Sequence, residues 1–492
     1  MDYSSLKSGT DIRGIASALG GKTVNLTDEA VYDISAAFVC WFMNKFSKNP
    51  CDMVVAVGRD SRITGENISK KVKEALTNAG VRVIDCGLAS TPAMFMTTVD
   101  LKTDAAIQIT ASHHPFDRNG LKFFISSGGL DSADISEIVA LANEGEEAVC
   151  NCKGVVVSMD YMSVYAATLR RTICDAVGKK ESDKPLKDYK IVVDAGNGAG
   201  GFYAKNVLEP LGADITGSQF LEPDGMFPNH IPNPEDANAM ASICAAVRNN
   251  NADLGLIFDT DVDRAGCVSS DGEEINRNRL IALAAYIATA GRKDAVIVTD
   301  SVTSDGLKEF IEKDLGCKHY RYRRGYKNVI NKAIELNGEG FDCPLAIETS
   351  GHAALKENYF LDDGAYLVTK IVIELALGKD INRLLTNLKM PKEEKEARFN
   401  IKAQDFKTYG QNVINKLEEF AKGTEGFKIA DDNREGIRVS TKNGFFLLRL
   451  SVHDPVMPMN FESNVEGGIA EDIATLKPFF EQFTDLDTSS LG

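Results

Sequence analysis

The chain has 492 residues, more than a single hydrophobic core can serve, so we expect about three to four domains. Its 43% hydrophobic and 26% charged residues are typical of a globular protein, and a formal net charge of −16 argues against nucleic acid as a partner, because phosphate contacts need clustered Lys and Arg. The ten cysteines form no CxxC pair, which argues against zinc or a disulfide framework and favours reduced thiols. Residues 1–7 lack a signal peptide's apolar region and no run could span a bilayer, so we expect a cytoplasmic protein without a membrane partner.

Short β-branched runs alternate with longer amphipathic segments along most of the chain. The runs that predict strands are residues 53–57, 81–84, 105–109, 191–193, 254–258, 295–298, 345–347 and 445–448. Helical periodicity is found between them, for example at residues 69–79 and 275–290. This alternation predicts α/β layers with mixed or parallel sheets. Residues 391–396, a proline followed by a charge run, predict a linker, and the small polar residues 485–492 predict a frayed tail.

A hydroxyl-bearing turn follows the apolar run 105–109. It contains Ser112 and His113, and Lys122 comes ten residues after the serine. A hydroxyl at the end of a strand, with an imidazole beside it and a lysine within reach, can carry a phosphoryl group near positive charge. The alternative is a Ser/His/Pro turn that only closes the strand.

Three carboxylates occupy alternate positions directly after the strand-like run 254–258, at Asp259, Asp261 and Asp263. At that spacing several carboxylate oxygens can converge on one hard cation, and Mg²⁺ prefers oxygen ligands. The mutual repulsion of three unneutralised aspartates argues against a merely solvated turn. An EF-hand does not fit, because its glycine and distal glutamate are missing. The sequence therefore predicts a metal site on this loop.

Two further loops are rich in glycine or proline. Residues 194–201 contain a G-x-G-x-x-G pattern after a strand, but the acidic residue that a dinucleotide site requires further on has only loose candidates in Asp214 and Glu222. We therefore expect a tight strand-to-helix turn there. Residues 223–234 hold four prolines, which fix φ and predict a stiff scaffold loop, with His230 as a weak site candidate.

Two polar loops follow later in the chain. Glu348 and Ser350 alternate after the run 345–347, and a carboxylate with a hydroxyl can hydrogen-bond neighbouring sugar hydroxyls, although a polar capping loop is the alternative. His352 is then a candidate acid/base or phosphate contact. Residues 323–327 are rich in positive charge and precede a helix-like segment. This pattern slightly favours phosphate binding, and a solvated basic face is the alternative.

These patterns together resemble the α-D-phosphohexomutase family, the phosphoglucomutase/phosphomannomutase group. The motifs that carry the resemblance follow the family's order along the chain: residues 9–14 (GTDIRG), 58–62 (GRDSR), 90–92 (STP), Ser112, the aspartates of 259–263, 348–352 (ETSGH), 362–364 (DDG) and 449–455 (RLSVHDP). The resemblance implies three similar α/β domains with mixed sheets and a smaller C-terminal α+β domain around a central cleft. The segments would be 1–158 with a phosphoserine loop, 159–272 with a metal loop, 273–391 with a sugar-recognition loop and 392–492 with a phosphate-binding loop.

The function that the resemblance implies is that of a phosphohexomutase, an isomerase interconverting hexose 1-phosphate and hexose 6-phosphate of glucose or mannose through a phosphoserine and a bisphosphorylated sugar. Ser112 would carry the phosphoryl group and hold Mg²⁺ with the three aspartates, and a hexose 1,6-bisphosphate would be the activator. Positive charge would come from Arg13, Lys122 and Arg264, while His113, Lys122 and His352 are unranked candidates for the general acid/base. Substrate contacts are implied for Glu348, Ser350, Tyr326, Lys327, Arg449, Ser451 and His453.

Two alternatives to a mutase stay open on the sequence. A metal-dependent sugar phosphatase would also use a phosphorylated serine, but it needs no distal phosphate loop, and the segment around Arg449 argues against it. A catalytically silent sugar-phosphate-binding protein is disfavoured by the intact Ser112, Lys122 and aspartates. The sequence indicates neither a preference among glucose, mannose and glucosamine phosphates nor an oligomeric state.

Overall fold

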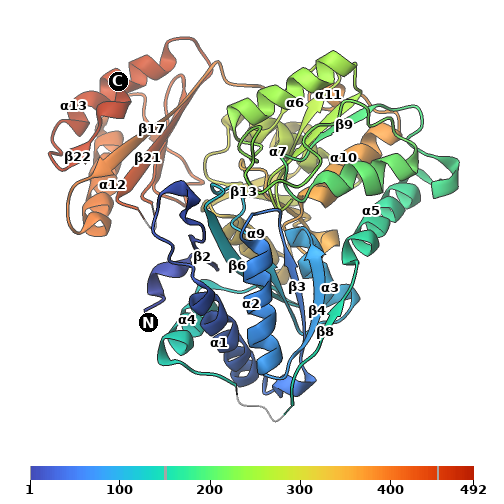
Figure 1. The fold of residues 1–492 in the computed structure, drawn as a ribbon. Helices are drawn as coiled ribbons and strands as arrows, with labels where there is room; N and C mark the ends of the chain where they lie inside the picture. Colours follow the sequence, from blue (N-terminus) through green and yellow to red (C-terminus); the bar gives the residue numbers. More distant parts are fainter. Residues whose placement is uncertain (1, 149–151, 452–453) are drawn as a thin grey trace. The chain divides into compact units, whose positions relative to one another are not determined.

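The computed structural model describes residues 2–148, 152–451 and 454–492 (Figure 1). The chain divides into two compact units. The first comprises Met1–Asn276, Ser350–Ala353 and Leu361–Ile381, and the second comprises Arg277–Thr349, Ala354–Phe360 and Asn382–Gly492.

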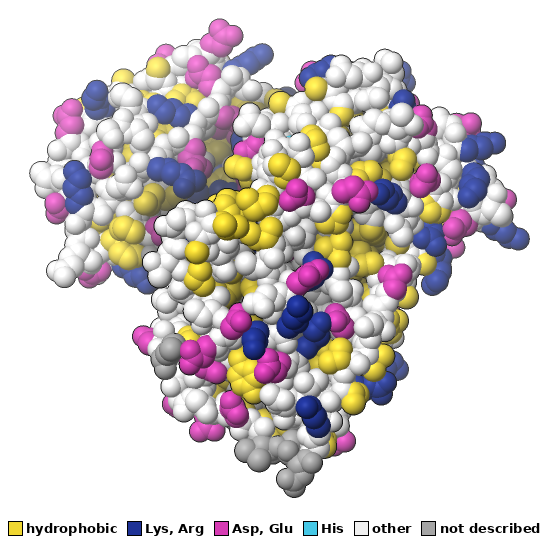
Figure 2. All heavy atoms as spheres, in the orientation of Figure 1, with side chains coloured by type: hydrophobic (Ala, Val, Ile, Leu, Met, Phe, Trp, Pro, Cys, Tyr) yellow, Lys and Arg dark blue, Asp and Glu magenta, His cyan; other side chains and the backbone are white. Residues whose placement is uncertain are grey.

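The surface drawn in Figure 2 intersperses Lys and Arg with Asp and Glu rather than gathering one sign of charge into a single field. Within the described part of the chain, no helix is both long and apolar enough to cross a membrane.

The first unit begins with an eight-stranded mixed sheet. Its strands, in spatial order, are β1 (Lys7–Ser8), β2 (Asp11–Ile15), β6 (Arg118–Ile125), β5 (Ala105–Ile109), β3 (Val54–Arg59), β4 (Arg82–Leu88) and β8 (Val156–Ser158), with β7 (Gly128–Gly129) paired to β6. β3 is parallel to β4 and β5, whereas β6 is antiparallel to β5 and β2. Three helices, α1 (Asp28–Phe46), α2 (Gly65–Asn78) and α4 (Ser132–Glu144), share one hydrophobic core with the sheet, and α3 (Thr91–Asp100) contacts β3, β5 and β6 (Figure 1).

A four-stranded mixed sheet follows in the same unit, in the order β12 (Glu274–Ile275), β11 (Ala265–Ser269), β10 (Leu254–Phe258) and β9 (Ile191–Asp194). Its helices are α5 (Tyr161–Val177), α6 (Ala237–Asn250) and α10 (Gly364–Ala376). β9 and β10 are parallel, and β10 and β11 form an antiparallel hairpin. The tight turn expected after β9 is present, and a Cβ on Gly198 would lie 2.6 Å from the carbonyl oxygen of Thr260. Glycine is therefore required where this turn meets the hairpin loop.

The second unit starts with another four-stranded sheet, in the order β14 (Lys318–Tyr322), β13 (Val296–Asp300), β15 (Leu345–Ile347) and β16 (Ala353–Leu355). β13 is parallel to both β14 and β15. The helices of this part are α7 (Arg277–Ala288), α8 (Asp305–Glu309), α9 (Tyr326–Gly338) and α11 (Ile381–Leu384). Helix α9 packs apolar side chains onto β13 and β15, which leaves the ends of the strands for polar loops.

The C-terminal domain is an antiparallel sheet with two helices. The strand order is β18 (Lys428–Ile429), β19 (Ile437–Ser440), β20 (Gly444–Leu448), β21 (Val456–Ser463), β17 (Glu393–Ile401) and β22 (Leu486–Asp487). Helices α12 (Phe406–Gly423) and α13 (Gly468–Phe480) close one hydrophobic core with this sheet (Figure 1).

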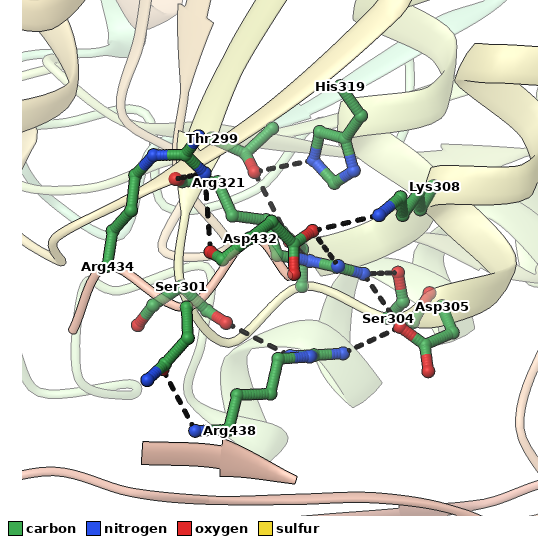
Figure 3. A network of polar contacts seen from close by, with 12 residues as sticks. Thr299, Ser301, Ser304, Asp305, Lys308, His319, Arg321, Asp432, Arg434 and Arg438 are labelled. Atoms are coloured by element: carbon green, nitrogen blue, oxygen red, sulfur yellow. Dashed lines mark hydrogen bonds and ion pairs between the residues drawn. The ribbon is translucent and has the colours of Figure 1, made fainter. Parts of the chain in front are cut away.

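A polar network ties the C-terminal domain to the preceding sheet within the second unit (Figure 3). Arg321 of β14 donates to Asp432 at 2.7 Å and to Asp305 at 2.9 Å. Arg438 of β19 donates to the same Asp305 at 2.9 Å, and Lys308 lies 3.1 Å from Asp432. Both arginine side chains are almost completely buried, so this interface depends on paired charges as well as on apolar contact.

The fold class expected from the sequence is confirmed: three α/β domains with mixed sheets and a smaller C-terminal α+β domain. Every predicted strand overlaps an observed one, and the predicted helical segments correspond to α2 and α7. Local hydrophobic patterning was sufficient here because these strands are buried along their length, as β5 and β10 show.

Three expectations are wrong. The predicted linker at 391–396 overlaps β17, which pairs with β21 and turns Ala397, Phe399 and Ile401 into the core at alternate positions. The tail is not frayed, since β22 pairs with β17 and Leu491 is buried. The expectation of reduced thiols fails for Cys51 and Cys152, which form a disulfide, while seven other cysteines of the described residues are free and buried.

Candidate active site

The loop that follows β5 presents Ser112. Its hydroxyl donates to Asp259 Oδ2 at 3.1 Å and lies 3.3 Å from His113 Nδ1, and only 1% of the residue is exposed. The Ser112 N–H donates to Thr110 Oγ1 at 2.8 Å. Its φ of 51° is left-handed, a conformation that serine keeps only when its surroundings constrain it. The loop thus directs the Ser112 hydroxyl at the predicted metal loop.

The hairpin loop between β10 and β11 brings Asp259, Asp261 and Asp263 together. All three are buried, and one oxygen of each lies within 4.8 Å of the others. Burial, reinforced by the charges of Asp263 and Asp261, raises the pKa of Asp259 well above its ordinary value. Asp261 Oδ1 and Asp263 Oδ1 are buried and accept no hydrogen bond from the described residues. Because buried oxygens need a partner, these residues fit a hard divalent cation.

Positive side chains balance the acidic cluster. Lys122 of β6 places its Nζ 2.5 Å from Asp263 Oδ2 and 3.3 Å from Asp261 Oδ2. Burial alone would raise the pKa of Asp263, but the charges of Lys122, His352 and Arg264 outweigh burial and lower it. The cluster therefore combines three carboxylates with positive side chains, of which Lys122 comes from β6 and Arg264 from the hairpin loop itself.

Two histidines border the same cluster. His352 Nδ1 is hydrogen-bonded to Asp362 and lies 4.0 Å from Asp263 Oδ1. Burial and the positive charge of Arg264 lower the pKa of His113 to about 2. His113 is therefore neutral near pH 7, so one nitrogen of its ring can accept a hydrogen bond.

The first unit thus gathers most of the predicted catalytic and metal residues: Ser112, His113, Lys122, Asp259, Asp261, Asp263, Arg264 and His352. Arg264 Nε lies 3.9 Å from Asp259 Oδ2. Arg13 of β2 is paired with Asp11 at 2.7 Å, and its charge is among those that lower the pKa of His113.

A second polar group lies in the second unit, at the end of β13. Asp300 is completely buried, accepts a hydrogen bond from Thr349 Oγ1 at 2.7 Å and lies 3.9 Å from Arg324 Nε. Glu348 accepts from the N–H of Gly325 at 2.5 Å. This bond holds the Glu348 carboxylate at the start of α9.

Tyr326 and Lys327 occupy the first turn of α9 and are both half-buried. The predicted sugar-recognition loop is divided, because Glu348 belongs to the second unit whereas Ser350 and His352 belong to the first. The chain passes from one unit to the other inside that loop.

The predicted distal phosphate site begins where β20 ends. Arg449 is largely buried and donates through Nη2 to Asn460 Oδ1 at 3.3 Å. Its Nε is buried and has no hydrogen-bond partner among the described residues. Ser451 Oγ accepts from the N–H of Asp454 at 3.2 Å, and His453 lies outside the described residues.

Three residues to which sequence reasoning gave no role also contact the site. Thr91, at the start of α3, donates its hydroxyl to Asp261, and Asp362 orients His352. Arg62 is buried beneath the Ser112 loop. Each lies in a motif that the sequence analysis used only to establish the family resemblance. Their positions as polar residues at the start of a helix or just after a strand could have indicated a role in the site.

Comparison with known proteins gives a consistent result. Models of phosphoglucomutase/phosphomannomutase alpha/beta/alpha domains I, II and III match residues 6–149, 164–272 and 276–390. A phosphoglucomutase of Neisseria gonorrhoeae is 30% identical over 463 residues, which cover 93% of each chain. A phosphomannomutase/phosphoglucomutase of Pseudomonas aeruginosa is 30% identical over 482 residues, or 97% of this chain and 95% of that one.

A crystal structure of a phosphoglucomutase/phosphomannomutase family protein from Burkholderia thailandensis superposes with a TM-score of 0.79 at 25% identity and covers 98% of each chain. With three matched domains and relatives aligned over nearly their whole length, the chain belongs to the phosphoglucomutase/phosphomannomutase family, the isomerases that interconvert hexose phosphates.

Proposed function

We propose that the enzyme moves a phosphoryl group between O1 and O6 of a hexose, with phosphorylated Ser112 as donor and a hexose 1,6-bisphosphate as intermediate and activator. In each half-reaction the bond from phosphorus to one oxygen breaks while a sugar hydroxyl or the Ser112 oxygen forms the new bond, and the hydroxyl proton passes to a base. The observation that carries the proposal is the Ser112 hydroxyl, bonded to Asp259 beside two carboxylate oxygens without hydrogen-bond donors in the described residues.

Asp259, Asp261 and Asp263, together with an oxygen on Ser112, would hold Mg²⁺. Bound there, the ion supplies neutralising charge to the transferring group. Lys122 and Arg264 already face this cluster, and with Arg13 they would donate hydrogen bonds to the remaining phosphoryl oxygens.

His113, Lys122 and His352 are the candidates for the proton transfer. His113 stays neutral near pH 7 and can accept a hydrogen bond from the attacking hydroxyl, but a pKa of about 2 makes it a weak base. The hydrogen bond between Nδ1 of His352 and the carboxyl of Asp362 orients the ring of His352, as in other histidines that act as acids or bases. Lys122 supplies an ammonium next to the carboxylates.

A mutase must also hold the phosphate that does not react, at a site remote from Ser112. We assign this role to Arg449, Ser451 and His453. The buried Nε of Arg449 supports the assignment, because an anion would satisfy it. A phosphatase has no need of such a site, so this feature favours the mutase over the phosphatase.

Glu348 and Ser350 would hydrogen-bond the sugar hydroxyls, with Tyr326 and Lys327 beside them. We propose that each of the four segments 1–158, 159–272, 273–391 and 392–492 supplies one of these loops. The substrates would be small phosphorylated hexoses. The enzyme would act in the cytoplasm, which is supported by the seven free cysteines among the nine described, although Cys51 and Cys152 form a disulfide.

The test begins with wild-type enzyme activated by glucose 1,6-bisphosphate. Intact-mass analysis and peptide mapping should find one phosphoryl group on Ser112, and coupled assays should show turnover of glucose, mannose or glucosamine 1-phosphate. Ser112→Ala should lack both label and turnover, whereas Ser127→Ala, at the exposed turn after β6, should keep both. Label on another residue together with an active Ser112→Ala enzyme would contradict the mechanism.

A further inference from the structure

Arg62 lies beneath the Ser112 loop and donates hydrogen bonds to its backbone carbonyls. The guanidinium donates to the carbonyl oxygens of Ser112, His114 at 2.6 Å, Pro115 at 2.7 Å and Arg118 at 2.9 Å. The side chain is completely buried. Buried carbonyls need donors, and here one side chain satisfies four of them within seven residues of chain.

The strand order explains how Arg62 reaches this loop. β3 and β5 are parallel neighbours, so the turn after Arg59 and the loop after Ile109 leave the same edge of the sheet. Asp60 neutralises the guanidinium, with its Oδ2 3.2 Å from Arg62 Nε, and its Oδ1 accepts the N–H of Arg62 at 2.9 Å. Asp60 therefore both balances the charge of the Arg62 guanidinium and constrains the Arg62 backbone.

The proline-rich loop 223–234, which belongs to the domain of the four-stranded sheet in the first unit, covers Arg62. The ring of Phe227 lies 5.2 Å from the guanidinium, within cation–π range. A Cβ on Gly225 would lie 2.3 Å from the N of Ile63, so only glycine permits this close approach. At the far end of the loop His230 Nε2 is 3.0 Å from Asp194 Oδ2, which anchors the loop to the end of β9.

We propose that Arg62 is a positioning residue of the phosphoryl transfer, that it holds the Ser112 loop in its reactive conformation, and that Phe227 keeps it in place. This inference rests on the proposed role of Ser112. With the Ser112 carbonyl bound to Arg62, the residue stays in its left-handed conformation and its hydroxyl stays 3.1 Å from Asp259. The motif 58–62 and the loop 223–234 thus act together to position Ser112.

Lysine cannot replace this arginine. Its ammonium has three donors in a compact group, whereas the guanidinium spreads five donors in a plane and can serve four carbonyls at once. A displacement of the reacting oxygen by about 1 Å can cost roughly a hundredfold in rate. Because Arg62 contacts only the enzyme, its loss should reduce kcat and the rate of Ser112 phosphorylation while leaving KM for the hexose phosphate nearly unchanged.

The experiment compares Arg62→Lys, Arg62→Ala and Phe227→Ala with Arg248→Ala as the matched control. Arg248, in α6, is likewise an arginine that donates to the backbone, but among the described residues it binds one carbonyl, that of Gly272, and makes no contact with the Ser112 loop. We expect Arg62→Lys to lose roughly ten- to a hundredfold in kcat and in the rate of Ser112 labelling by glucose 1,6-bisphosphate, with KM within about twofold of wild type. Free guanidinium ion should restore part of the activity of Arg62→Ala but none of Arg62→Lys, because only the alanine leaves a cavity of the right size. Arg248→Ala should keep wild-type kcat.

Phe227→Ala keeps the guanidinium and serves as the test should the Arg62 variants fail to fold. It should lose roughly three- to tenfold in kcat at unchanged KM, in keeping with a contact of about 1 kcal/mol. Wild-type kcat and labelling rate in a folded Arg62→Lys or in Phe227→Ala would overturn the inference. Absence of label on Ser112 in the wild-type enzyme would instead refute the proposed mechanism, so the two failures are distinguishable.

Discussion

Ser112 and Val262 share a left-handed backbone conformation that neither residue type favours, with φ values of 51° and 69°. Such a conformation costs on the order of 1–3 kcal/mol and persists only where neighbours impose it. Ser112 is held by Arg62, and the carbonyl of Val262 accepts the N–H of Gly364 at 3.1 Å. Both residues adjoin side chains of the reactive cluster, so the strain is located where positions matter most.

At the residue scale, Asp261→Asn tests the metal loop. The substitution keeps the shape of the side chain but removes a charge from the three buried carboxylates, so affinity for a divalent cation should fall. We expect kcat to drop roughly a hundredfold and the response to added MgCl₂ to be lost, with Tm nearly unchanged. Initial rates over a Mg²⁺ series and metal content after dialysis measure this. Asp188→Asn, at an exposed position, is the control; an Asp261→Asn enzyme that is active in EDTA would make the cluster purely structural.

Arg449→Ala tests the distal phosphate site. Loss of a charge-assisted contact should cost roughly 1.5–3 kcal/mol, or about ten- to a hundredfold in kcat/KM. The loss should be similar for glucose and mannose phosphates, because the two sugars differ only at C2 and this contact does not involve C2. Arg398→Ala, on the exposed face of β17, should leave kinetics unchanged. Equal kinetics for Arg449→Ala and wild type would place the remote phosphate elsewhere and revive the phosphatase interpretation.

At the element scale, parallel strands place the polar loops. β3 and β5 end beside each other, as do β9 and β10, so the residues after Arg59, Ile109, Asp194 and Phe258 leave common sheet edges. The antiparallel strand β6 then places Lys122 opposite Gln108 of β5, one residue before β5 ends at Ile109 and the Ser112 loop begins. The site is therefore a product of strand order, to which each element contributes one or two side chains.

Glu462 of β21 supplies a pH test of element packing. Burial, opposed in part by Arg438, raises its pKa to about 7, and the carboxyl accepts from the N–H of Asp305 at 3.3 Å. Between about pH 4.5 and 7 the native state keeps a proton that the unfolded state loses, so this group's contribution is complete below pH 4.5 and disappears as pH rises to 7, a change of roughly 3 kcal/mol. Glu462→Gln should remove that slope and raise Tm above pH 7.

Thermal unfolding at pH 5, 6, 7 and 8 measures the effect. Glu466→Gln, at an exposed position just after β21, is the control and should retain the wild-type slope. Parallel Tm profiles for Glu462→Gln and wild type would show that the carboxyl is not protonated in the folded enzyme at neutral pH.

At the scale of the whole molecule, the second unit is held together by charge pairs between its sheets (Figure 3). Burial alone would raise the pKa of Asp432, but the charges of Arg321 and Lys308 outweigh burial and lower it. The pairs therefore stabilise the ionised carboxylate, and this stabilisation is lost as pH falls below the ordinary range of an aspartate.

Asp432→Asn should destabilise that unit by roughly 3 kcal/mol, because Arg321 would lose one of its buried counter-charges. We expect a lower Tm in calorimetry and faster proteolytic release of the C-terminal domain. Asp431→Asn changes the neighbouring aspartate, whose side chain is 88% exposed, and should have no effect. Identical calorimetric profiles for both variants would mean that apolar contacts alone hold the two sheets of this unit together.

The sequence by itself determined the α/β class, the main strands and the two central loops, because hydrophobic runs and alternate aspartates are local patterns that need no partner to be recognised. Only the tertiary structure decided which segments distant in the sequence contact one another. Arg62 contacts the Ser112 loop fifty residues further along the chain, and Phe227 covers Arg62 from the loop that precedes α6. The charged first residues of β17 form a strand because they pair with β21. Each of these contacts depends on strand order, which the local pattern of side chains does not contain.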